Sequence, residues 1–439
     1  MARRAEPGDP HRTPPPGGQP GRLELLLRDR RLRLAFALVP VCFLLALIGR
    51  GMGETFVVFL LPLQEDFGWT RAEVAGIYSF FFLSAGAVGP LVGHVFDRFG
   101  PFWLFLGCIL FLAGGAFLSS HADALWQFYL TAGLMLGIAA AGMGTIPHSA
   151  ILSRWFRGRL GIAMAIVFSS IGIGNLLLTP FAQRLIIADG WRHAYLVLAG
   201  LALLALIPVL VMPWRRIAAG REDIGFNLAP RPAGPGGDAP ARTWTLQAAV
   251  RTRQFWGLFM VYFLTGNGMF SVALQAVTYL VETGIPRIEA AAAWGFVGLL
   301  TPLGMNIFGW LDGVIGRRPA VLLSYGLSLA GVVMLWITGR TDGQLFLILF
   351  VALFGLSFGA RGPLIAAICT RIFAGRRLGI IYGTVTVGGG LGGASGSAMG
   401  GLLHDLTGTY DLVFAYSVLA LCLGILPFFL VPGLASRRD

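Results

Sequence analysis

The chain has 439 residues, of which 56% are apolar and only 12% are charged. Soluble globular proteins carry about 25% charged residues, so this composition argues against a soluble enzyme, and the hydrophobicity excludes an intrinsically disordered chain. The formal net charge of +12 comes from arginine alone, because the sequence contains no lysine. Together with a mean hydropathy of +0.75, these figures indicate a membrane protein with many spans.

A helix that crosses a membrane needs about 20 mostly apolar residues. Twelve stretches of the sequence meet this requirement, so we predict an all-α membrane protein with twelve transmembrane helices. In chain order the stretches are residues 34–61, 72–95, 101–118, 125–152, 160–187, 193–214, 255–281, 290–311, 319–338, 344–372, 378–403 and 412–431.

Arginine is distributed unevenly among the loops that join these stretches. The N-terminal tail and every second loop are rich in arginine, whereas the alternate loops contain only Arg71, Arg184, Arg192, Arg287 and Arg340. Because basic residues collect on the cytoplasmic side of membrane proteins, we expect both termini in the cytoplasm. The protein is then a multi-pass protein of a bacterial plasma membrane.

The longest polar segment between two apolar stretches is rich in proline and glycine, which is typical of a linker. It divides the chain into two bundles of six helices. The expected units are a largely disordered cytoplasmic tail (1–33), an N-terminal bundle (34–214), a cytoplasmic linker (215–254), a C-terminal bundle (255–432) and a short cytoplasmic tail (433–439).

The two halves repeat short patterns at a nearly constant spacing. Arg71 and Glu73 begin the second stretch, and Arg287 and Glu289 begin the eighth, 216 residues later. The loops after the fourth and tenth stretches read FRGRLGI from residue 156 and FAGRRLGI from residue 373. Parallel repeats of six helices are a plan of secondary transporters, so we predict two bundles related by pseudo-symmetry.

Two loops carry a recognisable signature. Residues 93–100 read GHVFDRFG, and residues 309–318 read GWLDGVIGRR, with the aspartate one position early. On these motifs the chain resembles the major facilitator superfamily, whose members work by alternating access. The resemblance assigns Asp97, Arg98 and Asp312 to gating contacts, because an aspartate at a membrane edge can pair with arginine or with a helix N-terminus.

A narrower resemblance, to the monocarboxylate transporter and oxalate–formate antiporter branch, rests on four further patterns. They are residues 67–71 (FGWTR), 155–161 (WFRGRLG), 190–192 (GWR) and 400–410 (GGLLHDLTGTY). The acidic helix-1 motif of the animal monocarboxylate carriers is absent, and Arg50 and Glu54 occupy that region instead.

Three charged residues fall inside predicted spans, namely Arg50 and Glu54 in the first and Arg361 in the tenth. A charge at mid-bilayer costs at least about 2.5–3.5 kcal/mol and persists where it faces protein or water. The resemblance implies that helices 1, 4, 7 and 10 surround a central cavity, which Arg50 and Arg361 would then approach from opposite halves. Because a guanidinium binds a carboxylate through two hydrogen bonds, we expect Arg361 to be the principal carboxylate clamp, with Arg50 beside it.

Glu54 lies four residues after Arg50, on the same helix face. It either forms a structural ion pair with an arginine, or takes up a proton and so couples proton entry to anion entry. Secondary candidates for substrate binding are Asn267, which is the repeat counterpart of Arg50, and the polar residues Gln275, Tyr279 and His148. For His148 a hydrogen-bonded packing role is the alternative.

These features predict a secondary active transporter of small organic anions, monocarboxylates or short dicarboxylates, by proton symport or anion exchange. The alternatives are an efflux carrier for amphipathic drug-like compounds and a transporter-like ligand sensor. The sequence has no P-loop, metal-ligand pattern or nucleophile motif, so we expect no enzyme, no cofactor and no metal. The expected partners are the organic anion, protons and the lipid bilayer, without nucleic acid, and the expected functional unit is a monomer.

Overall fold

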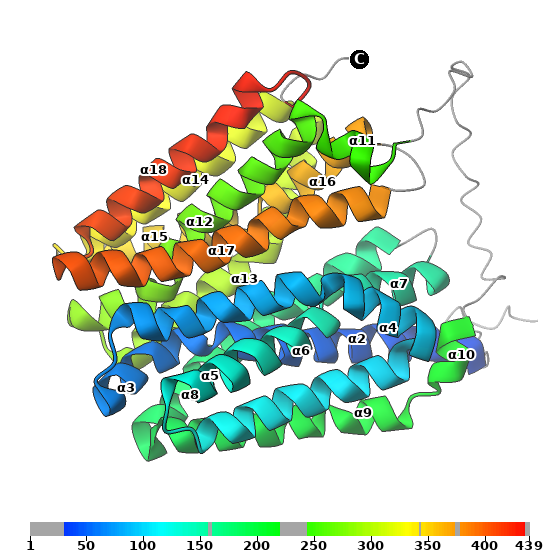
Figure 1. Cartoon of the computed structure of the whole chain (residues 1–439), viewed down its shortest axis with the longest axis horizontal. Helices are drawn as coiled ribbons and strands as arrows, with labels where there is room; N and C mark the ends of the chain where they lie inside the picture. The colour runs from blue at the N-terminus through cyan, green and yellow to red at the C-terminus, as the bar shows by residue number, and fades with distance from the viewer. Residues whose placement is uncertain (1–29, 157–159, 220–243, 342–343, 374–377, 435–439) are drawn as a thin grey trace, which may run out of the picture.

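The computed structural model describes residues 30–156, 160–219, 244–341, 344–373 and 378–434, and these residues form helices joined by short turns, without a strand (Figure 1). The elements of the N-terminal half are α2 (Arg30–Glu54), α3 (Phe56–Phe67), α4 (Arg71–Ser120), α5 (Leu125–Phe128), the π-helical turn η1 (Tyr129–Met135), α6 (Leu136–Gly142), α7 (Thr145–Trp155), α8 (Leu160–Leu204), α9 (Leu206–Val211) and α10 (Trp214–Ala219).

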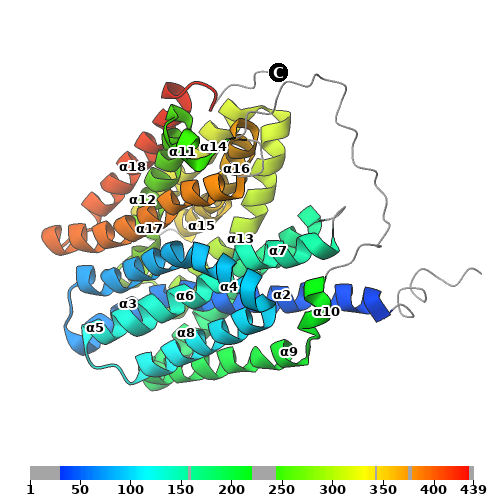
Figure 2. The ribbon, with the colours of Figure 1, turned by 45° about the vertical axis from the view of Figure 1, so that its right-hand side comes forward.

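The C-terminal half is built in the same way. Its elements are α11 (Leu246–Val250), α12 (Arg253–Glu282), α13 (Arg287–Val314), α14 (Arg317–Thr338), α15 (Gln344–Phe358), α16 (Arg361–Ile372), α17 (Leu378–Thr407) and α18 (Asp411–Leu430). The two halves form two bundles that lie side by side, with α10, α11 and the end of α18 at the same end of the molecule (Figures 1 and 2). The arginine distribution identifies this end as the cytoplasmic one.

Within the residues that the structure describes, ten helical segments are long and apolar enough to cross a membrane. The longest, Ile162–Val211, contains two spans, because the backbone leaves the helical conformation at Gly190, where φ is 85°. The 30-residue helix α17 is not one of the ten and supplies the remaining span. This arrangement gives the twelve spans that the sequence predicts.

The internal repeat is visible in the backbone. Six glycines with positive φ form three pairs, which are Gly68 with Gly284, Gly100 with Gly316, and Gly190 with Gly408. The members of the first two pairs are 216 residues apart and those of the third are 218 apart. Because glycine adopts positive φ at little cost, both halves turn at equivalent places.

Among the described residues, the bundles are joined mainly by two helix pairs, α4 with α17 and α8 with α13, and to a smaller extent by α3 with α12. Small residues let membrane helices approach closely, and here the approach requires glycine. A Cβ added to Gly295 of α13 would lie 2.9 Å from the Cα atom of Leu176 in α8, and one added to Gly401 of α17 would lie 2.8 Å from the carbonyl oxygen of Arg71 in α4.

Three spans are broken near their middles. The first breaks between α2 and α3 at Thr55, whose hydroxyl donates to the carbonyl oxygen of Met52 at 2.7 Å. The fourth breaks between α6 and α7 at residues 143–144, and the tenth breaks between α15 and α16 at residues 359–360. Broken helices of this kind are where secondary transporters place their binding sites.

Candidate functional site

The break in the first span carries an ion pair. Arg50 Nη2 lies 3.3 Å from Glu54 Oε1, and the hydroxyl of Tyr78 on α4 donates to Glu54 Oε2 at 3.0 Å. The side chain of Glu54 is 10% exposed, whereas that of Arg50 is 29% exposed. The carboxylate is therefore held from two sides, while the guanidinium keeps surface that another anion could contact.

The residues on either side of Arg50 pack on other parts of the N-terminal bundle. A Cβ added to Gly49 would meet Met143, which follows α6, and one added to Gly51 would meet Gly174 of α8. Exposure on this face rises toward the cytoplasmic end of α2, from buried Glu54 through half-buried Arg50 to exposed Pro40. Arg50 is thus partly exposed, between a buried carboxylate and an exposed proline.

Arg361 is the first residue of α16 and is only 2% exposed. Its Nη2 donates to the carbonyl oxygen of Ser324 at 3.0 Å and to the hydroxyl of Ser328, and its guanidinium carbon lies 4.2 Å from the centre of the Tyr325 ring. Its Nε and Nη1 have no hydrogen-bond partner among the described residues. The expectation that both arginines share one open space is not met in this conformation, because α14 draws Arg361 into the C-terminal bundle.

The two arginines nevertheless lie at the same depth. Counted at 1.5 Å per residue from the outer end of its own span, each of Arg50 and Arg361 lies about 25 Å below that end. On the same scale Phe82 and Phe270 are about 17 Å deep. Both arginines therefore lie on the cytoplasmic side of these two aromatic rings.

An aromatic layer joins the halves at that level. The ring centroids of Phe82 on α4 and Phe270 on α12 are 4.4 Å apart, those of Phe270 and Phe358 are 5.4 Å apart, and those of Phe358 and Trp294 are 6.0 Å apart. Asn175 of α8 also donates to the carbonyl oxygen of Trp294 at 3.4 Å. The four rings thus form a contact between α4 of the N-terminal half and α12, α13 and α15 of the C-terminal half.

The outer ends of the bundles are tied together around Arg71, whose side chain is 6% exposed. Its guanidinium donates to Glu282 and Tyr410, and to Gln275 Oε1 at 3.4 Å, all three of which belong to the C-terminal half. Burial raises the pKa of Tyr410 above its usual value, so the phenol stays protonated and donates to Glu282 Oε2 at 2.8 Å. Gln275, expected in the substrate site, is part of this outer cluster.

Two further contacts cross the outer end. The carboxylate of Asp405 accepts from the backbone N–H groups of Arg71 and Ala72, at 3.1 and 2.7 Å. Arg287 Nη2 lies 2.8 Å from Glu65 Oε1. Arg71 begins α4 and bonds the end of α12, whereas Arg287 begins α13 and bonds the end of α3, so the repeat generates two reciprocal bridges between the halves.

The seam between α4 and α17 opens from the outer end toward the cytoplasm. At the outer end, Gly401 lies so close to Arg71 that a Cβ would meet its carbonyl oxygen at 2.8 Å. Midway, a Cβ on Gly390 would lie 3.7 Å from the Cα atom of Gly86, and nearer the cytoplasm one on Gly383 would meet no described atom within 4 Å. This conformation is closed toward the outside and spread on the cytoplasmic side.

Three other predicted site residues lie away from Arg50. Asn267 donates to the hydroxyl of Ser395 on α17 at 2.8 Å and lines a lateral groove between α12, α17 and α18. The hydroxyl of Tyr279 donates to the carbonyl oxygen of Trp336 at 2.9 Å, within the C-terminal bundle. His148 is fully buried, with Nδ1 2.8 Å from the carbonyl oxygen of Gly144 and its ring stacked on Phe105. The structure does not bring these three together with Arg50, because Asn267 and Tyr279 contact helices of the C-terminal half and His148 packs on Phe105 of α4.

The predicted gating residues occupy the cytoplasmic ends. Asp97 and Arg98 are exposed, and among the described residues Asp97 has no ion-pair partner. Asp312 pairs with Arg317 of its own half, with Oδ1 3.3 Å from Nε. In this conformation none of the three joins the two bundles through an ion pair within the described chain.

Sequence reasoning missed the outer cluster and the aromatic layer. The sequence indicates Arg71 and Arg287 as matching positions of the repeat, but assigns neither of them a partner. The sequence does contain a signal for these contacts. Arg71 and Arg287 lie in loops that are otherwise poor in arginine, and acidic residues end the helices that precede them. The phenylalanines of the layer could not be singled out among the 33 in the chain.

Two six-helix repeats that meet along glycine-rich seams, with ionisable residues beside broken helices, define an all-α multi-pass membrane transporter. The sequence profile of the Major Facilitator Superfamily matches residues 41–396. The chain therefore belongs to this superfamily, and it is a multi-pass protein of the cell membrane.

Known proteins agree with this assignment. The chain is 28% identical to monocarboxylate transporter 3 of Rattus norvegicus, over 86% of this chain and 76% of that protein. It is 23% identical to the uncharacterized MFS-type transporter YcxA of Bacillus subtilis (strain 168), over 88% of this chain and 92% of that protein. The predicted resemblance to the monocarboxylate branch is confirmed.

Among solved structures, the nucleoside transporter NupG is similar in fold, with a TM-score of 0.66 and 12% sequence identity over 92% of this chain and 100% of NupG. This likeness supports the fold alone, and confirms the predicted all-α fold.

Proposed function

We propose that this transporter carries small organic anions, and that Arg50 is the residue that binds the negative charge. The observation that supports this best is the exposed part of the Arg50 guanidinium beside a carboxylate that Tyr78 holds in place. The relatives named monocarboxylate transporters support carboxylates as the substrate class. A neutral substrate would bring no counter-charge to the part of the guanidinium that Glu54 leaves exposed.

Glu54 gives the site a route to coupling. A substrate carboxylate competes with Glu54 for Arg50, and a proton on Glu54 removes that competition. Proton symport follows if Glu54 is protonated as the anion binds, and anion exchange follows if it stays charged throughout. Transport that keeps the same pH dependence in Glu54→Gln would exclude Glu54 as the coupling group.

Arg361 has a second role in this proposal. It supplies the positive charge of the C-terminal half, and its unbonded Nε and Nη1 are available to substrate once the bundles rearrange. We expect Arg361→Ala to reduce transport of dicarboxylates more than transport of monocarboxylates. An equal reduction for both would assign Arg361 to packing against α14.

The deciding experiment is counterflow in proteoliposomes with radiolabelled mono- and dicarboxylates. Arg50→Gln should lower kcat/KM about 30-fold or more, which corresponds to about 2 kcal/mol for truncating one partner of a charge pair. Arg50→Lys should recover part of it, because lysine keeps the charge and loses the two-pronged geometry. Arg184→Gln, which removes an exposed arginine at the outer surface, is the matched control. Wild-type carboxylate counterflow by Arg50→Gln would overturn the proposal.

An efflux carrier for amphipathic compounds is the second candidate, and the aromatic layer favours it. Phe82, Phe270 and Phe358 present ring faces beside the level of the arginines, which suits flat apolar solutes. If labelled carboxylates give no counterflow while amphipathic dyes are transported and Phe270→Ala weakens that transport, this second function replaces the first.

A further inference from the structure

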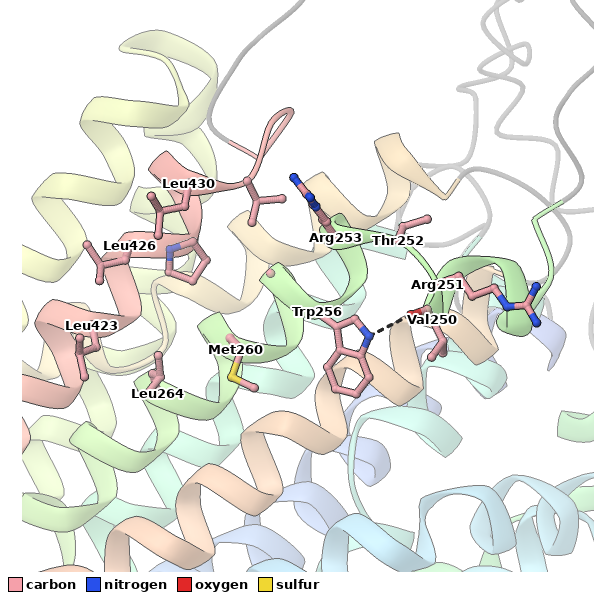
Figure 3. Close-up of a pocket in the computed structure, with 13 residues that line it drawn as sticks. Val250, Arg251, Thr252, Arg253, Trp256, Met260, Leu264, Leu423, Leu426 and Leu430 are labelled. Carbon is pink, nitrogen blue, oxygen red and sulfur yellow. Dashed lines mark hydrogen bonds between the residues drawn. The ribbon is translucent and has the colours of Figure 1, made fainter.

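A groove runs down the outside of the C-terminal bundle between α12 and α18, beginning at the cytoplasmic end (Figure 3). Its volume is about 570 Å³. Below the rim its walls are apolar, and they include Met260, Leu264, Leu423, Leu426 and Leu430. Of these, all but Leu264 are at least 40% exposed, so no described part of the chain covers the groove.

The length of the groove matches one leaflet of a bilayer. From Arg253 at the rim to Leu264 at the floor, α12 rises about 16 Å. Half of the hydrocarbon core of a bilayer is about 15 Å thick. A single acyl chain that enters from the cytoplasmic surface therefore reaches the floor of the groove at about the midplane of the membrane.

The rim is positively charged. Arg251 and Arg253 are both exposed, and neither has an ion-pair partner among the described residues. Thr252 between them caps α12, since its hydroxyl accepts from the backbone N–H of Phe255 at 3.2 Å. The N-terminus of this 30-residue helix adds partial positive charge at the same level.

Trp256 marks the boundary between rim and wall. Its indole N–H donates to the carbonyl oxygen of Val250 at 2.9 Å, which holds the ring beside α11 (Figure 3). Tryptophan prefers the level of the lipid headgroups, where one edge is polar and the ring is apolar. Its position places the two arginines at headgroup level and the leucines in the hydrocarbon.

We propose that this groove binds an anionic glycerophospholipid of the cytoplasmic leaflet. The phosphate lies at Arg253, and one acyl chain lies along Met260, Leu423 and Leu426. Arg251 points away from Arg253 (Figure 3) and adds positive charge to the rim without sharing the phosphate. A zwitterionic lipid matches the apolar walls equally well but brings a cation to a rim whose described lining residues include two arginines and no acid. The selectivity therefore resides in the headgroup, and the depth of binding resides in the acyl chain.

Native mass spectrometry of the detergent-purified full chain tests this, with phosphatidylglycerol and phosphatidylcholine of identical acyl chains as probes. The wild type should bind phosphatidylglycerol at least tenfold more tightly. Each arginine near an anionic headgroup contributes about fivefold, so Arg251→Ala with Arg253→Ala should weaken phosphatidylglycerol binding about 25-fold and leave phosphatidylcholine unchanged. Arg216→Ala with Arg318→Ala removes the same charge elsewhere on the cytoplasmic side and should have little effect.

The acyl part is tested separately with Leu423→Trp, which fills the groove from an exposed position, and with Leu412→Trp on the same helix as control. We expect Leu423→Trp, but not Leu412→Trp, to weaken the binding of both lipids. If the arginine variants fail to fold, these two tryptophan variants test the proposal. Equal affinity for the two lipids, an equal loss in the control arginine pair, displacement of the lipid by inorganic phosphate, or a groove occupied by a second copy of the chain would each overturn the proposal.

Discussion

The outer and cytoplasmic ends of the interface between the bundles are built from similar residues but are in opposite states. At the outer end, Arg71 and Arg287 bridge to acids of the other half, and Gly401 allows the backbones of α17 and α4 to touch. At the cytoplasmic end Asp97 is exposed, and Gly383 faces open space within the described chain. Side-chain bridges thus occur where the backbones meet, because hydrogen bonds and ion pairs need partners within about 3 Å.

We propose that the transporter works by alternating access, in which this difference gives each end a separate part. Closing the cytoplasmic end requires the α4–α17 seam to rock about its middle, where Gly390 and Gly86 keep a looser contact. The outer bridges must break in the same motion. Their strength therefore sets how strongly the protein prefers the conformation that opens toward the cytoplasm.

The largest effect is expected from Arg71→Ala. The change leaves Glu282 and Tyr410 without their cation, and we estimate its cost to the closed outer end at about 3 kcal/mol, the low end of the range for buried pairs because Glu282 is 37% exposed. In a cysteine-free background with Thr278→Cys on α12, an impermeant thiol reagent added outside should label about 100-fold faster. Arg340→Ala breaks the Arg340–Asp411 pair within one half and should not accelerate labelling. Equal labelling rates in Arg71→Ala and Arg340→Ala would show that the contacts of Arg71 do not keep the outer end closed.

Gly401→Ala should have the next largest effect. The added methyl group meets backbone atoms of Arg71 and Ala72 at 2.8 and 3.0 Å, and overpacking of this kind costs about 1–3 kcal/mol. We expect roughly tenfold faster labelling in the same assay. Gly383→Ala on the same helix meets no described atom within 4 Å and is the matched control. If both substitutions behave alike, the seam does not open toward the cytoplasm.

Arg287→Ala should have a smaller effect. Its pair with Glu65 is exposed, with side chains 37% and 51% accessible, and such pairs contribute about 0.2–1 kcal/mol. We expect labelling to rise about twofold to fivefold, and less at high salt because screening already weakens the pair. The reversal Glu65→Arg with Arg287→Glu should restore the wild-type rate. If the reversed pair is labelled as fast as Arg287→Ala, the bridge does not contribute to closing the outer end.

The smallest effect on stability is expected from Asp97→Asn. Asp97 is exposed and has no ion-pair partner among the described residues in this conformation, so the melting temperature should change by no more than about 1 °C. Turnover in proteoliposomes should fall nonetheless, because we propose that the contact of Asp97 forms when the cytoplasmic end closes. Unchanged turnover, or a large loss of stability, would contradict its gating role.

Local patterns predicted a large part of this molecule. The first predicted span, 34–61, lies within the range of α2 and α3, and the spacing of Arg50 and Glu54 predicted their ion pair. The glycines at 100 and 316, seen as matching positions of the repeat, both carry positive φ. Each of these features depends on residues close in sequence or on a repeated pattern, and so can be recognised without knowing the packing.

Other residues could be recognised as important but not placed. Arg361 lies inside a helix of the tenth predicted span, yet its guanidinium turns toward Ser324 and Ser328. Gln275 lies on the expected helix, but it contacts Arg71, 204 residues away in the sequence. The direction of a long side chain depends on which neighbouring helix supplies an acceptor, and that helix is distant in the chain.

The hydrocarbon core demands apolar side chains and internally bonded backbone, so twelve helices, their orientation and the duplication of the halves follow from residue order alone. The pairing of Arg71 with Glu282, the burial of Arg361 and the closed outer end follow from how the two bundles meet. That meeting is set by glycine contacts between helices hundreds of residues apart, and it changes as the transporter works. A linear pattern therefore predicts which charges the membrane contains, whereas the packed helices determine which of them face water, substrate or one another.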